Sequence, residues 1–308
     1  MLPPAILLMG PTATGKTALA VELVKRFPCD IISVDSAMIY RGMDIGTAKP
    51  GPDVLEVAPH RLIDICDPVE NYSAGEFRRD ALKHMQEITA AGRIPLLAGG
   101  TMLYFHVLQR GIADLPPADL QRRRELDARA ARVGWGALHR ELAKVDPDAA
   151  ARIHPNDPQR IQRALEVYDI SGKSLSELQR VGAVEKIPYR LIKLGLSPPD
   201  RKLLHDRIAA RFHAMMDAGF LEEVRHLSRN PALTPQHPSM RSVGYRQLLE
   251  FLDHGGSLDA AVERGIVATR QFAKRQLTRL RAEADVLWHD SDAPALLDQV
   301  VRVLAERL

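Results

Sequence analysis

The stretch Gly10-Pro11-Thr12-Ala13-Thr14-Gly15-Lys16-Thr17 decides the fold of this chain. It follows the apolar run 5–9, which is typical of a buried strand, and it precedes residues 18–25, whose apolar side chains recur at helical spacing. A strand, a glycine loop and a helix in this order predict a P-loop, whose backbone N–H groups and helix N-terminus bind a phosphate group. Lys16 adds a full positive charge, and the Thr17 hydroxyl can bind Mg²⁺. The stretch therefore predicts a di- or triphosphate site; the alternative is a chance glycine turn before a helix.

Length and composition indicate an ordinary soluble globular protein. The 308 residues are 45% hydrophobic and 26% charged, and they allow two domains or one core with an insertion. A net charge of +3 is too small to establish a nucleic-acid partner by itself. Cys29 and Cys66 have neither metal-site spacing nor a disulfide pattern, which fits a reducing compartment. We expect a cytoplasmic protein with no signal peptide and no membrane partner.

Strands and helices alternate in the first part of the chain. Further strands are expected at 30–35, 60–65 and 94–98, and a helix at 74–91, with Ser73 and Glu76 as a capping box. This alternation predicts an α/β fold: a parallel, nucleotide-kinase-like sheet with helices on both faces. Gly10, Asp35 and Thr101 all follow strands, so we expect them at the carboxyl edge of the sheet, where ligands bind.

The middle of the chain has a different pattern. From about Asp114 to residue 188 only helical patterns occur, and they are rich in arginine. One of these helices begins at Asp157 and Pro158 and ends at Gly172. We therefore expect a P-loop core formed by 1–113 and 190–308, interrupted by a helical insertion domain at 114–189.

The chain returns to the sheet with a strand at 191–196 and then forms two long helices. The first, 201–218, carries an apolar stripe; the second, 258–282, has six cations and no acid between Arg264 and Arg281. Within the second helix, Arg270, Lys274 and Arg281 share one face. A phosphate backbone is the natural partner for such a stripe, although a charge run is often only a solvated face. Trp288, shortly after this helix, is expected in the core.

The chain lacks one feature of P-loop NTPases. Those enzymes carry an acid after a distant apolar strand, whereas here the strand 94–98 ends in Gly99-Gly100. The obvious strand-end acid is instead Asp35, on the strand that follows the P-loop helix. This position is typical of kinase-like folds, in which the acid faces an acceptor group.

Several sequence blocks together resemble the bacterial tRNA dimethylallyltransferases. The blocks are collinear with that family from the first strand to the last long helix. They are the P-loop, Asp35-Ser36-Ala37-Met38-Ile39-Tyr40, Met43-Asp44-Ile45-Gly46-Thr47-Ala48-Lys49-Pro50, Gly99-Gly100-Thr101, Asn156-Asp157-Pro158-Gln159-Arg160, Arg241-Ser242-Val243-Gly244-Tyr245-Arg246 and Lys274-Arg275-Gln276.

The resemblance implies a reaction and a set of roles. The family transfers a five-carbon prenyl group from dimethylallyl diphosphate to N6 of the adenosine 3′ to the anticodon (position 37) of tRNA, releasing pyrophosphate. Lys16, Asp35 and Thr101 would be catalytic: Lys16 would neutralise the leaving group, Asp35 would act as base, and Thr101 would orient the amine or the base. The alternatives are a Mg²⁺-shell or capping role for Asp35 and a packing role for Thr101. The residues implied for the diphosphate are Gly10, Pro11, Thr12, Ala13, Thr14, Gly15, Lys16, Thr17 and Arg211, with Mg²⁺ on Thr17; a surface ion pair would explain Arg211 nearly as well.

The resemblance also implies an RNA surface around a flipped-out base. The residues implied to contact tRNA are Asp35, Ser36, Ala37, Met38, Arg123, Gln159, Arg160, Ile161, Gln162, Arg163, Arg241, Ser242, Val243, Gly244, Tyr245, Arg246, Lys274, Arg275, Gln276, Leu277, Thr278, Arg279, Leu280 and Arg281. We expect a monomer that binds the anticodon stem-loop. The competing hypotheses are a small-molecule P-loop kinase, a prenyltransferase acting on free AMP, and a non-catalytic RNA-binding protein.

Overall fold

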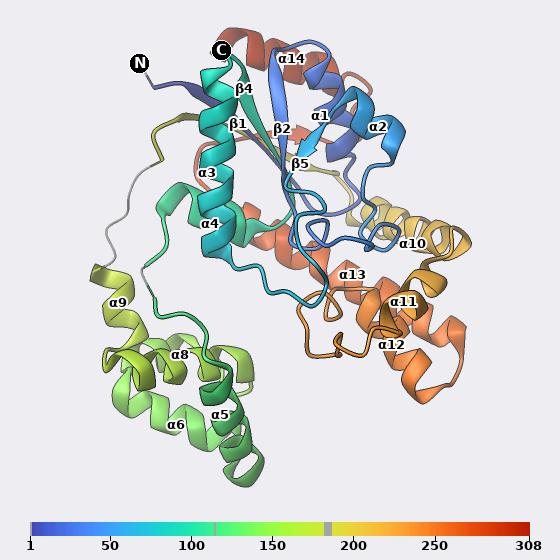
Figure 1. Cartoon of the computed structure of the whole chain (residues 1–308). Helices are drawn as coiled ribbons and strands as arrows, with labels where there is room; N and C mark the ends of the chain where they lie inside the picture. Colours follow the sequence, from blue (N-terminus) through green and yellow to red (C-terminus); the bar gives the residue numbers. More distant parts are fainter. Residues whose placement is uncertain (1, 114, 182–186) are drawn as a thin grey trace. The chain divides into compact units, whose positions relative to one another are not determined.

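A computed structural model describes residues 2–113, 115–181 and 187–308. The chain divides into two compact units: Met1–Leu108 with Pro188–Leu308, and Gln109–Ile187. The predicted boundary at Asp114 lies outside the described residues. Each unit is described below by itself (Figure 1).

The first unit is built on one parallel sheet. Its strands are β1 Pro4–Met9, β2 Cys29–Val34, β3 His60–Arg61, β4 Ile94–Gly99, β5 Arg190–Ser197 and β6 Val286–Asp290, in the order β3-β2-β4-β1-β5-β6. Every neighbouring pair is parallel. β1 lies between β4 and β5, and its residues Ala5–Met9 are fully buried, as their unbroken apolar pattern predicts. The predicted α/β, kinase-like fold is confirmed.

Helices connect and cover these strands. The helices of the first unit are α1 Lys16–Val24, α2 Pro52–Val57, α3 Ala74–Ala90, α4 Met102–Arg110, α10 Arg201–Asp217, α11 Phe220–Ser228, α12 Tyr245–His254, α13 Leu258–Leu280 and α14 Leu296–Arg307. α1 and α14 share a core cluster with β1 and β5, whereas α10, α11, α12 and α13 form a second cluster around Phe212 and Phe220. The second cluster also includes Ile39, Tyr40 and Met43, so it holds the chain that follows β2.

Local signals in the sequence placed several helices correctly. Ser73 caps α3, and its capping box with Glu76 is present. The apolar stripe of α10 is buried as predicted, because Leu204, Ile208, Phe212 and Met215 all face the helical cluster. No helix in the described ranges is long and apolar enough to span a membrane.

Two expectations for the sheet were wrong. The strand predicted at 60–65 is only β3, His60–Arg61, because Leu62 and Asp64 adopt left-handed backbone angles and turn the chain away. Trp288, predicted in the core, is 44% exposed on β6, the strand at the edge of the sheet.

The second unit consists of helices with a core of their own. They are α5 Leu120–Val133, α6 Trp135–Val145, α7 Pro147–Arg152, α8 Pro158–Ser171 and α9 Leu175–Val181. α8 begins with Asp157 as N-cap and Pro158 in its first turn, and it ends at Gly172, as predicted. Its buried Ile161 and Leu165 pack with Leu138 and Leu142 of α6.

Candidate active site

The P-loop joins β1 to α1 in a conformation that its sequence explains. Gly15 caps α1 at φ 76°, and Ala13 also has a positive φ of 64°, so the loop folds back on itself before the helix. Gly10 has no room for a side chain, because a Cβ would lie 2.9 Å from the Leu196 carbonyl oxygen on β5. The Thr14 hydroxyl donates to the Pro11 carbonyl at 2.8 Å and closes the turn from inside. The result is a preformed concave backbone before a helix N-terminus.

Two cations meet beside this loop. Lys16 Nζ donates to the Pro11 carbonyl at 2.6 Å. Burial, and then the neighbouring Arg211, lower the pKa of Lys16 to about 7, although Asp35 partly opposes this shift. Burial also lowers the pKa of Arg211, against the same opposing effect of Asp35. Arg211, on α10, has no ion pair or hydrogen bond within the described part of the chain, so the predicted alternative of a surface ion pair does not hold. Two poorly compensated cations favour a bound anion.

Asp35 lies directly after β2 and is held by its own backbone. Its Oδ1 accepts the N–H of Ala37 at 2.8 Å and that of Met38 at 3.2 Å. In the described residues its Oδ2 receives no hydrogen bond. No helix of the described chain begins directly after Asp35, so its carboxylate caps a turn rather than a helix, and it uses only one of its two oxygens to do so. The other oxygen is available to accept a proton or a ligand.

Thr101 fixes the backbone next to Asp35. Its N–H donates to the Val34 carbonyl at 3.2 Å, and its Oγ1 accepts the Ser36 N–H at 3.1 Å. The last residue of β2 and the residue after Asp35 are thus both tied to Thr101. This geometry suits a residue that orients the carboxylate.

Gln276 joins the P-loop to the end of β4. Its Oε1 accepts the Thr12 N–H at 3.0 Å, and its Nε2 donates to the Gly100 carbonyl at 2.8 Å. The side chain is only 6% exposed. Both amide atoms therefore bind protein backbone, which gives this side chain a structural role; because it also lines the cavity, the implied contact to tRNA stays a prediction. Motifs alone did not reveal this bridge, because its partners are far apart in sequence.

These residues line one cavity of about 690 Å³ in the first unit. Lys16, Thr17, Asp35, Thr101 and Arg211 contribute its polar lining. Apolar side chains also line it: Ile208, Phe212 and Met215, which the sequence analysis placed only in the buried apolar stripe of α10, together with Phe272 of α13 and Tyr104 of α4. The cavity can therefore hold a molecule with a charged end and an apolar part.

Family models match most of the chain. A model described as IPP transferase matches residues 38–283, and one described as isopentenyl transferase matches residues 4–68. The chain belongs to the IPP transferase family. The resemblance read from the sequence blocks is confirmed.

Solved structures of similar proteins support the same assignment. The chain is 36% identical to the full-length tRNA isopentenylpyrophosphate transferase from Bacillus halodurans, over 98% of this chain and 96% of that one, with a TM-score of 0.72. It is 34% identical to tRNA delta(2)-isopentenylpyrophosphate transferase from Staphylococcus epidermidis, over 99% of this chain and 100% of that one, with a TM-score of 0.71. A eukaryotic dimethylallyltransferase acting on tRNA is 27% identical, over 98% of this chain and 77% of that one, with a TM-score of 0.77.

The implied RNA residues of the first unit fall into groups that differ in exposure. Ser36, Ala37, Met38, Arg241, Ser242, Val243 and Arg275 line the cavity. Lys274, Thr278, Arg279 and Arg281 are exposed on or just after α13, whereas Arg270 on the same face is half-buried. Leu277 and Leu280 are buried, so their side chains pack inside the unit, whereas Tyr245 is buried and also lines the cavity.

The implied RNA residues of the second unit are also divided. Glu166 is fully buried and binds the guanidinium groups of both Arg123, at 2.8 Å, and Arg163, at 2.7 Å. Burial raises the pKa of Glu166, but these two arginines outweigh it and hold that pKa below its usual value. Ile161 is buried in the helical core, which is inconsistent with a side-chain contact to RNA. Gln159 and Arg160 are exposed, whereas Gln162 donates to Asp127 at 2.7 Å.

Proposed function

We propose that this chain transfers a dimethylallyl group from dimethylallyl diphosphate to N6 of the adenosine 3′ to the anticodon in tRNAs, releasing pyrophosphate. The observation that carries the proposal is the arrangement around Asp35. A carboxylate with one unoccupied oxygen lines the same cavity as the P-loop, Lys16 and Arg211. β4 ends at Gly99 and is followed by Gly100, so no acid stands at this strand end to activate a hydrolytic water.

The cavity contains what such a transfer requires. The P-loop amides with Lys16 and Arg211 would bind the diphosphate and neutralise the charge that develops when its C–O bond breaks. The N6 lone pair would form the new bond to the dimethylallyl carbon, and Asp35 would accept the N6 proton. Thr101 would keep the Asp35 carboxylate oriented through Ser36 and Val34. The target base would be flipped out of the anticodon loop to reach this point.

The residues present also fit Mg²⁺. The Thr17 hydroxyl is exposed in the first turn of α1, and it shares the cavity with the Asp35 carboxylate; both are the hard oxygen ligands that Mg²⁺ prefers. Across the described ranges no group of three or more His, Cys, Asp or Glu could hold a metal alone. When bound, Mg²⁺ would supply additional charge neutralisation on the leaving pyrophosphate.

The proposed contacts to tRNA come from exposed cations and from the cavity rim. Lys274, Arg279 and Arg281 of the α13 region present positive charge without a described ion pair. In the second unit, Gln159 and Arg160 are the exposed members of the implied set. We further propose that the enzyme acts as a cytoplasmic monomer, as expected from the sequence.

A labelling experiment tests the function. Purified protein, Mg²⁺ and labelled dimethylallyl diphosphate are incubated with unmodified tRNA, with free AMP, or with ATP and no tRNA. We expect label in tRNA, and nuclease digestion with mass spectrometry should place it on the adenosine 3′ to the anticodon. Transfer to AMP, or ATP turnover as the main reaction with tRNA left unlabelled, would overturn the proposal.

A further inference from the structure

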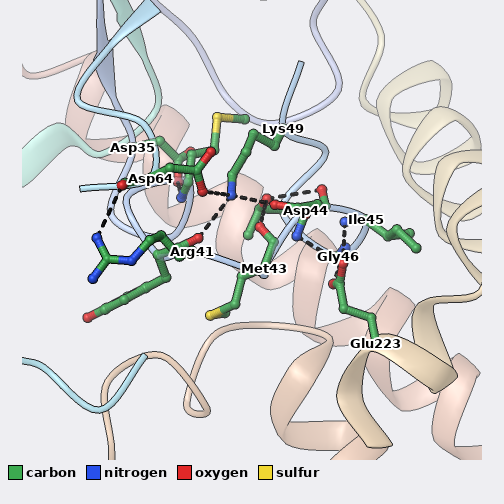
Figure 2. Close-up of polar contacts among 12 residues, drawn as sticks. Asp35, Arg41, Met43, Asp44, Ile45, Gly46, Lys49, Asp64 and Glu223 are labelled. Atoms are coloured by element: carbon green, nitrogen blue, oxygen red, sulfur yellow. Dashed lines mark hydrogen bonds and ion pairs between the residues drawn. The ribbon is translucent and has the colours of Figure 1, made fainter. Parts of the chain in front are cut away.

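The segment that follows Asp35 is held by one carboxylate from a distant helix. Glu223 of α11 accepts three consecutive backbone N–H groups, those of Asp44 at 2.9 Å, Ile45 at 2.7 Å and Gly46 at 3.1 Å. The Tyr245 hydroxyl donates to the same carboxylate at 2.5 Å. Figure 2 shows Glu223 facing this row of amides. A carboxylate with four donors is a strong and directional anchor.

A buried ammonium group holds the other end of the same segment. Lys49 Nζ donates to Asp44 at 2.5 Å, to Asp64 at 2.5 Å and to the Tyr40 carbonyl at 2.9 Å (Figure 2). Its side chain is only 4% exposed. Lys49 therefore joins the segment both to itself and to the turn at Asp64, where the backbone adopts a positive φ.

The segment between these two anchors is a wall of the active-site cavity. Gly46, Thr47 and Ala48 line the cavity, whereas neither Glu223 nor Lys49 does. The wall has a conformation that needs support: Ala48 lies at φ 53°, and a Cβ at Gly46 would be 2.0 Å from the Phe220 ring. The Thr47 hydroxyl donates to the Met43 carbonyl at 2.7 Å and closes the turn.

We propose that Glu223 and Lys49 are positioning residues. They set the shape of the part of the cavity that binds the prenyl donor, dimethylallyl diphosphate. The inference rests on the proposed function. The wall they hold lines the cavity together with Ile208, Phe212 and Met215, the apolar residues suited to a prenyl chain. The wall lies in the same loop as the turn that fixes Asp35, with residues 39–45 between them, so a displaced wall would weaken binding of dimethylallyl diphosphate and misalign it with the base. The exposed cations of the α13 region and the exposed residues of the second unit, which we propose to contact tRNA, lie outside this wall, so tRNA binding should depend on the wall less than binding of dimethylallyl diphosphate does.

The test compares two adjacent glutamates on α11. Glu223→Gln replaces one acceptor oxygen by an NH₂ group that faces backbone donors. Glu222→Gln is the matched control, because Glu222 is exposed and its one ion pair in the described part of the chain is with Arg225 on its own helix. We expect Glu223→Gln to raise the KM and the calorimetric Kd for dimethylallyl diphosphate about tenfold or more, consistent with the cost of a small misplacement. We expect the control to equal the wild type, and tRNA affinity to change less than about twofold in both.

The KM for dimethylallyl diphosphate distinguishes a positioning role of Glu223 from a loss of folding stability in the variant. A variant that only folds less well loses active enzyme, which lowers kcat but leaves the KM for the donor unchanged. Lys49→Met should also raise this KM, whereas Lys49→Arg, which keeps the cation between Asp44 and Asp64, should restore it to within about threefold of the wild type. These Lys49 variants decide the question if Glu223→Gln does not fold.

The outcomes also separate this inference from the proposed function. An unchanged donor KM and Kd in Glu223→Gln and Lys49→Met, with active wild-type enzyme, would overturn the positioning role alone. A wild-type enzyme that transfers no label to tRNA would overturn the proposed function instead.

Discussion

At the carboxyl end of β2, Asp35 combines a structural and a proposed chemical role in one side chain. Its Oδ1 caps the turn through the N–H groups of Ala37 and Met38. Asparagine keeps an oxygen for these two amides but cannot accept a proton. Asp35→Asn should therefore leave the turn intact and remove only the base.

We expect Asp35→Asn to lower kcat by about 10²–10⁴-fold, the usual contribution of a general base. Its tRNA affinity, measured by filter binding, should change little, and its thermal unfolding should match the wild type. Equal losses in turnover and in tRNA affinity would contradict the assignment of Asp35 as the base.

Lys16 leads to a prediction about pH. Burial and Arg211 lower its pKa to about 7 in the free protein, and a bound diphosphate would raise it again because the anion stabilises the charged form. Above pH 7 binding must therefore take up a proton, so the affinity for pyrophosphate should fall as pH rises, by at most about tenfold per pH unit.

Calorimetry in two buffers of different ionisation enthalpy at pH 8 should show this proton uptake, and Lys16→Met should abolish it. The free energy of unfolding of the ligand-free protein depends on pH in the opposite direction to the pyrophosphate affinity. The unfolded chain binds more protons than the native state between the native pKa of about 7 and the ordinary lysine pKa of 10.5, so this group makes the free energy of unfolding rise with pH over that range. Proton uptake that persists in Lys16→Met would contradict this account.

At the scale of elements, helix α13 has a buried side that packs against the rest of the unit and an exposed side that is positively charged. Its buried side includes Gln276, which joins the P-loop to β4, and Gly265, where a Cβ would lie 2.3 Å from the Phe212 ring of α10. Its other side carries exposed cations. The sequence indicated the cations but not the bridge.

Neutralising two of these cations should change the salt dependence of tRNA binding. If Lys274 and Arg281 contact phosphates, replacing both by glutamine should reduce the slope of log K against log salt by about 1.5. A matched control replaces Lys25 and Arg26, two exposed cations at the end of α1, and should leave the slope unchanged. An unaltered slope in the α13 variant would show that the stripe is only a solvated face.

At the scale of the whole molecule, the two units have separate hydrophobic cores. The helical unit packs around Leu138, Leu142 and Leu165, and none of these belongs to a core cluster of the sheet unit. Damage to one core should therefore leave the ligand site of the other unit intact.

Leu142→Ala tests this separation. Leu142 is fully buried, so the void left by its truncated side chain should destabilise the helical unit by about 2–5 kcal/mol. Pyrophosphate affinity, which depends on the sheet unit, should stay at the wild-type value, while tRNA affinity should fall if the helical unit contacts RNA. A loss of pyrophosphate affinity would show that the two units are coupled.

What the sequence determined by itself was local. The P-loop, the apolar runs of the individual strands, the capping of α3 by Ser73 and of α8 by Asp157, and the buried stripe of α10 all depend on neighbours within a few turns of chain. Such patterns can be read directly, since periodicity and capping are short-range effects. The family resemblance added the roles of Asp35, Thr101 and Lys16, because their motifs are specific.

Only the tertiary structure decided which distant groups meet. Gln276 binds an amide 264 positions away, and Glu223 holds amides 177 to 179 positions away. It likewise decided that Trp288 is exposed, that β3 is short, and that Arg123 binds Glu166 inside the helical unit. The physical reason is that a side chain's hydrogen-bond partners and burial depend on the packing of whole elements, which no local pattern of residues encodes.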